Sequence, residues 1–142
     1  MIHGSCHCQQ IKFEITVQAL TVRYCYCQTC RKLSAADYSV VAHVDCDQFA
    51  LTRGAGHLLS YESRPGKWRY YCDHCFAPIY VVTNNEPDFL RVRMGLLDSH
   101  SDGLPNGKLP VAVTGHMWVS EKPAWRSIDD GLPVYLYEYT GD

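Results

Sequence analysis

Seven of the eight cysteines in this 142-residue chain fall into three tight groups, and this arrangement constrains the fold more than any other feature. The groups are Cys6-x-Cys8, Cys25-x-Cys27-x-x-Cys30 and Cys72-x-x-Cys75, while Cys46 stands alone. Tetrahedral zinc binds thiolate sulfurs at about 2.3 Å and so holds them roughly 3.7 Å apart. A C-x-x-C turn supplies that spacing, and so do alternate residues on one face of a strand. Three such groups in one short chain strongly indicate zinc.

The rest of the composition favours metal over disulfides. The N-terminal stretch MIHGSCHCQQ has neither the basic nor the apolar region of a secretory signal, so we expect a cytoplasmic, reducing location. Hydrophobic residues make up 46% of the chain, enough for a core without disulfide support. The net charge is −2 without charge runs, and the apolar runs are short. We therefore expect neither a nucleic-acid partner nor a membrane partner.

Hydrophobic alternation with a period of two predicts a mostly β protein, with residues 1–142 as a single domain. In IKFEITV, for example, Ile11, Phe13 and Ile15 share one face. Further segments rich in Tyr, Val and Ile are predicted as strands: 21–27, 38–44, 57–63, 67–72, 78–83 and 89–94. Other segments predict a hairpin turn (63–67), a short helix (28–37) and another helical turn (122–129). Together these patterns indicate antiparallel sheets with zinc knuckles at strand ends.

Seven thiol ligands divide as four plus three. Two pairs make a closed structural site, whereas the triplet leaves one position open, as in catalytic zinc sites. The spacing alone leaves other pairings open, because two thiols of the triplet can join Cys72 and Cys75. A histidine can also close the triplet, with His74, His100 and His116 as candidates. An open three-thiolate zinc is a weak Lewis acid and suits a soft thiol better than water, which favours a sulfur-containing substrate.

Several stretches resemble the glutathione-dependent formaldehyde-activating enzyme family, which also includes centromere protein V. They are residues 4–15, 25–32, 70–80, 95–98 and 116–125. The resemblance implies a zinc-containing β fold similar to the Mss4-like, or β-tent, fold with two Zn²⁺ per chain. It implies a structural zinc on four cysteines (Cys6, Cys8, Cys72 and Cys75) and a catalytic zinc on three (Cys25, Cys27 and Cys30). The fourth position of the second zinc would be left for water or a substrate thiol.

The same resemblance implies a carbon–sulfur lyase of the S-(hydroxymethyl)glutathione synthase type. The thiolate of glutathione would add to formaldehyde or another small aldehyde. Arg31 and Lys32 directly follow the triplet and are predicted to bind the glutathione carboxylates. Weaker candidates are Arg23, Arg53 and Arg64. One alternative is a non-enzymatic zinc-binding interaction module, with an occluded triplet and an exposed apolar patch. The other is a redox sensor in which Cys27 and Cys30 form a disulfide when zinc leaves.

The chain departs from the family pattern at three positions. Glycine, which often supplies a positive φ in such turns, commonly follows each structural cysteine pair, but Gln9 and Phe76 stand there. Tyr26 replaces a histidine found in many relatives, and we predict that it alters only the pocket wall. Other residues have ordinary interpretations: a turn position (Asp98) and core or pocket wall (Trp68, Trp118 and Trp125).

Overall fold

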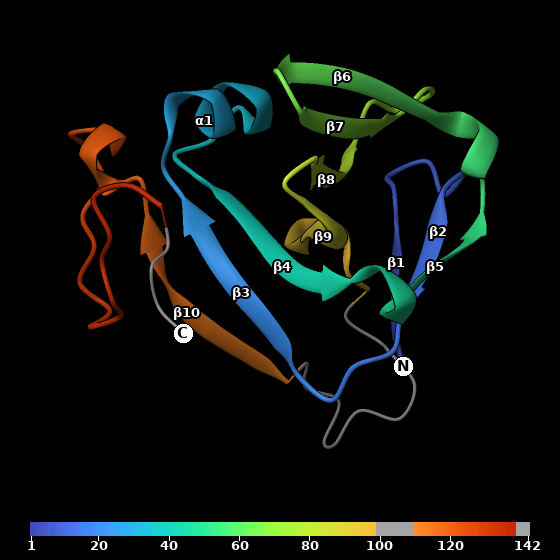
Figure 1. Ribbon diagram of the computed structural model, residues 1–142, viewed down its shortest axis with the longest axis horizontal. Helices are drawn as coiled ribbons and strands as arrows, with labels where there is room; N and C mark the ends of the chain where they lie inside the picture. Colours follow the sequence, from blue (N-terminus) through green and yellow to red (C-terminus); the bar gives the residue numbers. More distant parts are fainter. Residues whose placement is uncertain (99–109, 139–142) are drawn as a thin grey trace.

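The structure, a computed structural model, describes residues 1–98 and 110–138 and consists mainly of β-strands (Figure 1). The strands are β1 (Ile2–Ser5), β2 (Lys12–Ile15), β3 (Leu20–Cys25), β4 (Ser39–Asp45), β5 (Phe49–Arg53), β6 (Leu58–Arg64), β7 (Lys67–Cys72), β8 (Pro78–Thr83), β9 (Glu86–Arg93) and β10 (Val111–Met117). The helical segments are the α-helix α1 (Gln28–Ser34) and short 3-10 helices at Cys46–Gln48, Ala55–His57, Met94–Leu96 and Val119–Glu121. The predicted mostly β fold class is confirmed. Among the described residues, no helix is long and apolar enough to cross a bilayer.

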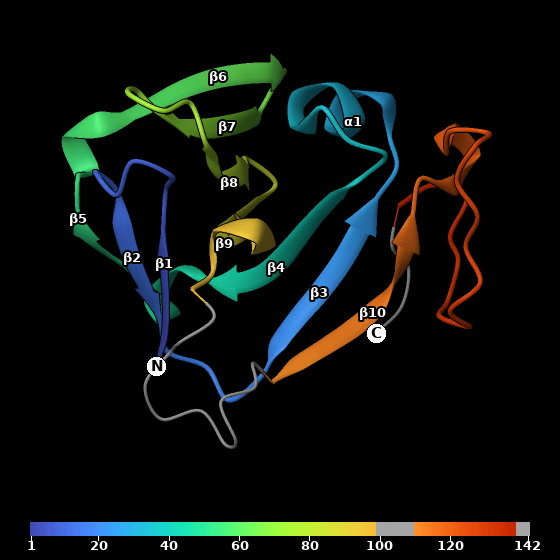
Figure 2. The ribbon, with the colours of Figure 1, turned by 180° about the vertical axis from the view of Figure 1, so that it is seen from behind.

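The strands form two sheets. The smaller has the order β1-β2-β5, and the larger has the order β10-β3-β4-β9-β8-β7-β6. All neighbours within them are antiparallel except β10, which runs parallel to β3. Both views show the small sheet at the end of the molecule away from β10, with α1 near the ends of β6 and β7 (Figures 1 and 2).

Strands β1, β5 and β10 were not predicted from the sequence. Two of them are only four and five residues long, and β10 contains a register shift between Val113 and Gly115. Pairing with distant strands, rather than local alternation, therefore accounts for them. The helical turn expected in 122–129 is a single tight turn, with the Arg126 N–H donating to the Pro123 carbonyl over 3.1 Å.

The alternation predicted in residues 11–17 builds the core between the sheets. Ile11 and Ile15 are fully buried and Phe13 is 1% exposed. Gly4 lies opposite Phe13 in β1, and a Cβ there would meet the ring at 2.2 Å. Residue 4 is therefore a glycine because the aromatic ring occupies the space of a side chain.

Two turns of similar design present the four cysteines of the first group. The backbone N–H of Cys6 and that of Cys72 each donate, over 3.0 Å, to the carbonyl five residues later. The N–H groups of Gln9 and Phe76 donate back to the carbonyls of these cysteines, also over 3.0 Å. Both residues adopt the left-handed conformation, with φ of 63° and 62°. The positive φ expected at the family glycines is thus present here in residues that carry side chains.

This conformation makes Phe76→Gly a stabilising substitution. A side chain in the left-handed region costs roughly 1–2 kcal/mol, and glycine removes that cost but adds about 0.5–1 kcal/mol of unfolded-state entropy. Phe76 is 66% exposed, so little packing is lost. We expect a melting temperature about 2–3 °C higher by calorimetry. Phe76→Ala is the control, because it removes the ring and keeps the strained backbone; an equal rise in that variant would contradict the explanation.

Candidate functional site

The first cysteine cluster joins the two similar turns. Its sulfur atoms lie within 4.8 Å of one another: Cys6, Cys8, Cys72 and Cys75. The Sγ–Sγ distances are 3.5 Å from Cys6 to Cys8 and 3.7 Å from Cys8 to Cys72, close to the spacing required around tetrahedral zinc. Backbone N–H groups of Ile11 and His74 donate to the Cys6 and Cys72 sulfurs over 3.3 and 3.4 Å. These bonds stabilise thiolates, so the cluster fits a closed metal centre.

The second cluster sits where β3 passes into α1. Cys25 ends β3, Cys27 caps α1 with extended backbone angles, and Cys30 lies in the first turn of α1. The Cys30 N–H donates to the Cys27 sulfur over 3.3 Å, which fixes the C-x-x-C turn. The three sulfurs lie within 4.8 Å of one another. The structure therefore separates the seven thiols into a group of four and a group of three, resolving the pairing that spacing left open.

None of the described histidines joins the three-cysteine cluster. His74 lies in the turn of the other cluster, and His100 lies outside the described residues. Both ring nitrogens of His116 have other partners: Nε2 is 2.8 Å from a carboxylate oxygen of Asp130, and Nδ1 is 2.8 Å from the Tyr26 hydroxyl. His116 is therefore not the closing ligand.

Tyr26 has a different place from the one predicted. It is 1% exposed and does not line the cavity beside the cysteines, although it stands between Cys25 and Cys27 in the sequence. The prediction that it alters only the pocket wall is wrong. Its hydroxyl instead continues a chain through His116 to Asp130 and connects the cysteine loop to the C-terminal segment.

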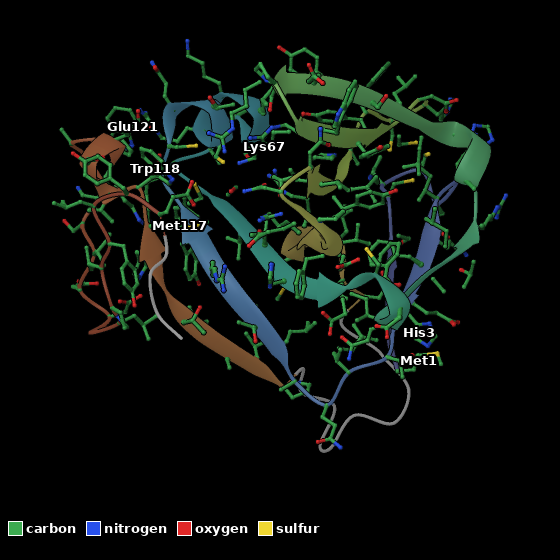
Figure 3. All side chains as sticks on the ribbon, in the orientation of Figure 1. Met1, His3, Lys67, Met117, Trp118 and Glu121 are labelled. Atoms are coloured by element: carbon green, nitrogen blue, oxygen red, sulfur yellow. The ribbon has the colours of Figure 1, made fainter. Side chains whose placement is uncertain are left out.

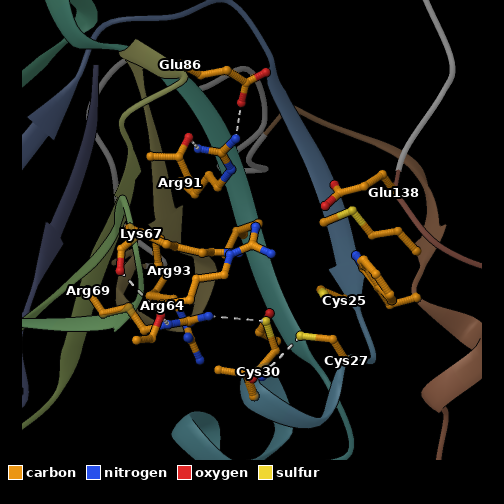
Figure 4. A pocket seen from close by; sticks show the side chains of 18 of the residues that line it. Cys25, Cys27, Cys30, Arg64, Lys67, Arg69, Glu86, Arg91, Arg93 and Glu138 are labelled. Carbon is orange, nitrogen blue, oxygen red and sulfur yellow. Dashed lines mark hydrogen bonds and ion pairs between the residues drawn. The ribbon is translucent and has the colours of Figure 1, made fainter.

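The three-cysteine cluster opens into a cavity of about 530 Å³. Strand register explains which side chains reach it, because directly paired residues share a face. Cys25 pairs with Ser39, Val41 with Arg93, and Val81 with both Arg91 and Arg69, so one face runs from the cluster across the sheet. Five cationic side chains from β6, β7 and β9 line the cavity: Arg64, Lys67, Arg69, Arg91 and Arg93. Figure 4 shows them across the cavity from Cys25 and Cys27, with Arg69 directed toward Cys30 and Arg91 turned toward Glu86.

The opposite wall comes from the C-terminal part of the chain. It includes Met117, Trp118, Glu121 and Glu138. Figure 3 places Trp118 and Glu121 on the β10 side and Lys67 on the β7 side. Glu121 also accepts a hydrogen bond of 3.0 Å from the N–H of Gln28, so it attaches this wall to the start of α1. The cavity thus has a cationic strand wall and a wall carrying two carboxylates.

The cavity cations differ in how far they are neutralised. Arg91 forms an ion pair with Glu86 and donates to Thr83 over 3.2 Å. Arg69 Nη2 instead lies 3.9 Å from the Cys30 sulfur. Burial lowers the pKa of Lys67 and that of Arg93 below their ordinary values. Hydrogen bonds from Cys25 and Cys27, aided by the charge of Arg69, hold the pKa of Cys30 below the usual range. The site therefore favours negative charge.

Arg31 and Lys32 do not line this cavity. They lie in the last turn of α1, where positive charge interacts favourably with the helix dipole. Of the weaker candidates, Arg64 lines the cavity and Arg23 and Arg53 do not. Neither does Asp98, which accepts a 3.3 Å hydrogen bond from Ser5.

Sequence reasoning missed most of the cationic wall. The available signal was alternation of basic residues within predicted strands: KWR over 67–69 and RVR over 91–93 place both cations of each pair on one face. Trp118 does form part of the cavity wall, as predicted, whereas Trp125 is 76% exposed and donates to Asp37 over 2.9 Å.

The fold and site define a class of β proteins with two cysteine clusters able to hold metal, one closed and one opening into a cavity. Residues 1–121 match the family described as glutathione-dependent formaldehyde-activating enzyme, and the chain belongs to this family. The chain is also similar to the crystal structure of a Rhodobacter sphaeroides protein, with a TM-score of 0.57 and 20% identity over 78% of this chain and 99% of that chain. That likeness shows a shared fold. Asp130 and Glu138 lie beyond the residues matched by the family.

Proposed function

We propose that this protein is a two-zinc carbon–sulfur lyase or synthase that acts on the glutathione adduct of formaldehyde or another small aldehyde. The observation that carries this proposal is the position of the three-cysteine cluster at the end of a cavity of about 530 Å³ with a cationic wall. We further propose that residues 1–142 form one zinc-binding domain and that the protein works in the cytoplasm.

The residues present fit two zinc ions. The cluster of four cysteines would hold a structural ion, and Cys25, Cys27 and Cys30 would hold a second ion with one position left over. When bound there, zinc supplies a site that keeps a soft thiol ionised as the nucleophilic thiolate. The chain itself places that site beside the cationic wall and encloses it with Trp118 and Met117.

The proposed reaction is an addition of a thiol to a carbonyl. The thiol loses its proton, its sulfur forms a bond to the aldehyde carbon, and the carbon–oxygen π bond breaks toward oxygen. The oxygen then takes up a proton, giving a hydroxymethyl thioether, and no oxidant or reductant is needed. Holding the two reactants together in the cavity would account for much of the rate. The reverse reaction uses the same positions.

Glutathione has two carboxylates, and the cavity offers cations for them. Lys67 and Arg64 line it, and among the described ion pairs neither has a carboxylate partner. We propose these two residues as the carboxylate contacts. The role predicted for Arg31 and Lys32 is kept as a competing proposal, since long side chains at the end of α1 can meet a ligand that extends out of the cavity.

The alternative functions predict other arrangements. A non-enzymatic interaction module was expected to have an occluded triplet, whereas the described triplet lines a cavity. A redox sensor needs an oxidant to reach Cys27 and Cys30 so that they can form a disulfide, but Cys30 is only 5% exposed. The cavity beside the triplet and the burial of Cys30 therefore favour thiol chemistry over an interaction module or a redox sensor.

The proposal predicts that purified two-zinc protein accelerates formation of the hydroxymethyl adduct from glutathione and formaldehyde, followed by NMR exchange spectroscopy. Lys67→Met should weaken glutathione about tenfold, because a charge-assisted hydrogen bond is lost, but should spare 2-mercaptoethanol, which has no carboxylate. Arg31→Ala is the matched control and should change glutathione affinity by less than about twofold. A larger effect from Arg31→Ala than from Lys67→Met would show that the glutathione carboxylates bind to the basic residues of α1 instead. Wild-type protein without any acceleration or thiol binding would contradict the enzyme proposal.

A further inference from the structure

Arg69 is unusual among the cavity cations because it is almost completely buried. It lies on β7 with 3% of its surface exposed, although guanidinium groups normally stay in water. Its Nε donates to the Ser63 hydroxyl over 2.9 Å, which fixes the plane of the group. Its Nη2 points at the Cys30 sulfur over 3.9 Å, as Figure 4 shows.

Among the described residues, no carboxylate forms an ion pair with this buried cation. Burying an uncompensated charge is costly, so a folded chain that does so places a counter-charge nearby. The charge within contact is the three-cysteine cluster. Arg91, by comparison, lines the same cavity but is already neutralised by Glu86.

We propose that Arg69 makes the open metal site selective for an anionic fourth ligand over a neutral one. This inference rests on the proposed function, because it requires a metal ion on Cys25, Cys27 and Cys30. Three thiolates and a divalent ion carry one negative charge, and a fourth thiolate raises this to two. A neutral ligand such as imidazole leaves it at one. A fixed cation beside Cys30 therefore stabilises the anionic complex and has little effect on the neutral one.

The cations of the strand wall then have two different roles. Arg69 contacts the cluster and acts on the charge of the metal-binding end of any ligand. Lys67 and Arg64 line the cavity, but it is Arg69 that contacts a cluster sulfur; the charge of Cys30 acts on Lys67 without a contact, so we assign Lys67 and Arg64 mainly to the rest of the ligand. Loss of Arg69 should therefore weaken every anionic ligand strongly, even a small one, whereas loss of Lys67 should weaken ligands that carry a carboxylate most.

The test uses protein with cobalt(II) exchanged into the second site, whose sulfur-to-cobalt absorption reports each added ligand. Three probes are titrated at pH 7, where a buried lysine at position 69 keeps its charge better than at alkaline pH: 2-mercaptoethanol as a small thiol, azide as an anion without sulfur, and imidazole as a ligand that binds as the neutral base. In Arg69→Gln, we expect 2-mercaptoethanol and azide to bind ten- to a hundredfold more weakly and imidazole to stay within about twofold. Arg69→Lys keeps the charge and should restore most of the loss. Lys67→Met should weaken 2-mercaptoethanol and azide much less than Arg69→Gln does, because Lys67 does not contact the sulfurs.

Equal weakening of all three probes in Arg69→Gln would show that Arg69 only supports the fold, and would overturn the inference. So would unchanged binding of both anions. Wild-type protein gives an independent test if the variant does not fold: imidazole binding as tightly as both anions would also overturn it. Wild-type protein that binds azide but no thiol would contradict the proposed function while supporting the role of Arg69.

Discussion

Cys72→Ser is expected to unfold the protein or leave it insoluble. Cys72 is fully buried, and its sulfur lies in the cluster of four that joins the turn after β1 to the turn between β7 and β8. Metal binding at such a closed site is coupled to folding and contributes on the order of 10 kcal/mol, comparable with the whole stability of a domain. We expect a fall of 15 °C or more in the melting temperature of any soluble fraction.

Cys30→Ser should behave differently, although Cys30 is also buried, with 5% exposure. It removes one ligand from a cluster at the edge of a cavity rather than from one that joins distant segments. We expect a loss of only about 1–3 kcal/mol, together with loss of one metal equivalent by elemental analysis. Cys46→Ser is the matched control, because Cys46 is exposed and outside both clusters, and it should change neither quantity. Equal collapse of the Cys30 and Cys72 variants would contradict the division into structural and open sites.

Binding of glutathione to the two-zinc protein should release about one proton per site at neutral pH. The ligand must be a thiolate, and the free thiol has a pKa of about 8.5, so lower pH weakens binding. The apparent affinity should rise about tenfold per pH unit below that value. At higher pH it should fall again, because burial lowers the pKa of Lys67 and its charge is lost earlier than that of an ordinary lysine.

Calorimetry in buffers of different ionisation heat counts the released proton. S-methylglutathione is the control ligand, because it keeps both carboxylates and lacks the ionisable thiol; it should bind weakly and release no proton. Lys67→Met should remove the fall at high pH and keep the rise at low pH. Glutathione binding without proton release would show that its sulfur does not enter as a thiolate.

Local rules were sufficient to predict much of this protein from its sequence. The three local cysteine groups follow from their spacing, since C-x-C and C-x-x-C can each place two sulfurs on one ion. The buried face of β2 follows from alternation, and α1 follows from the short segment after Cys27. The features that were predicted all depend on residues within a few positions of one another. The positive φ at residues 9 and 76 was not predicted, because glycine is the residue that usually adopts it; the structure shows that both turns keep this conformation with Gln9 and Phe76.

Tertiary structure decided what surrounds those local features. Cys8 and Cys72 are 64 positions apart in the sequence, yet their sulfurs lie next to each other. Only the three-dimensional arrangement of the strands determines that pairing. Arg69 reaches Cys30 because β7, β8, β9, β4 and β3 are neighbours in that order with a register that keeps one face common. Arg31 is next to Cys30 in sequence but lies away from the cavity, because successive helical residues point about 100° apart. Proximity along the chain is therefore a weak guide to the second layer of a site, since sheet register brings together side chains that no local pattern relates.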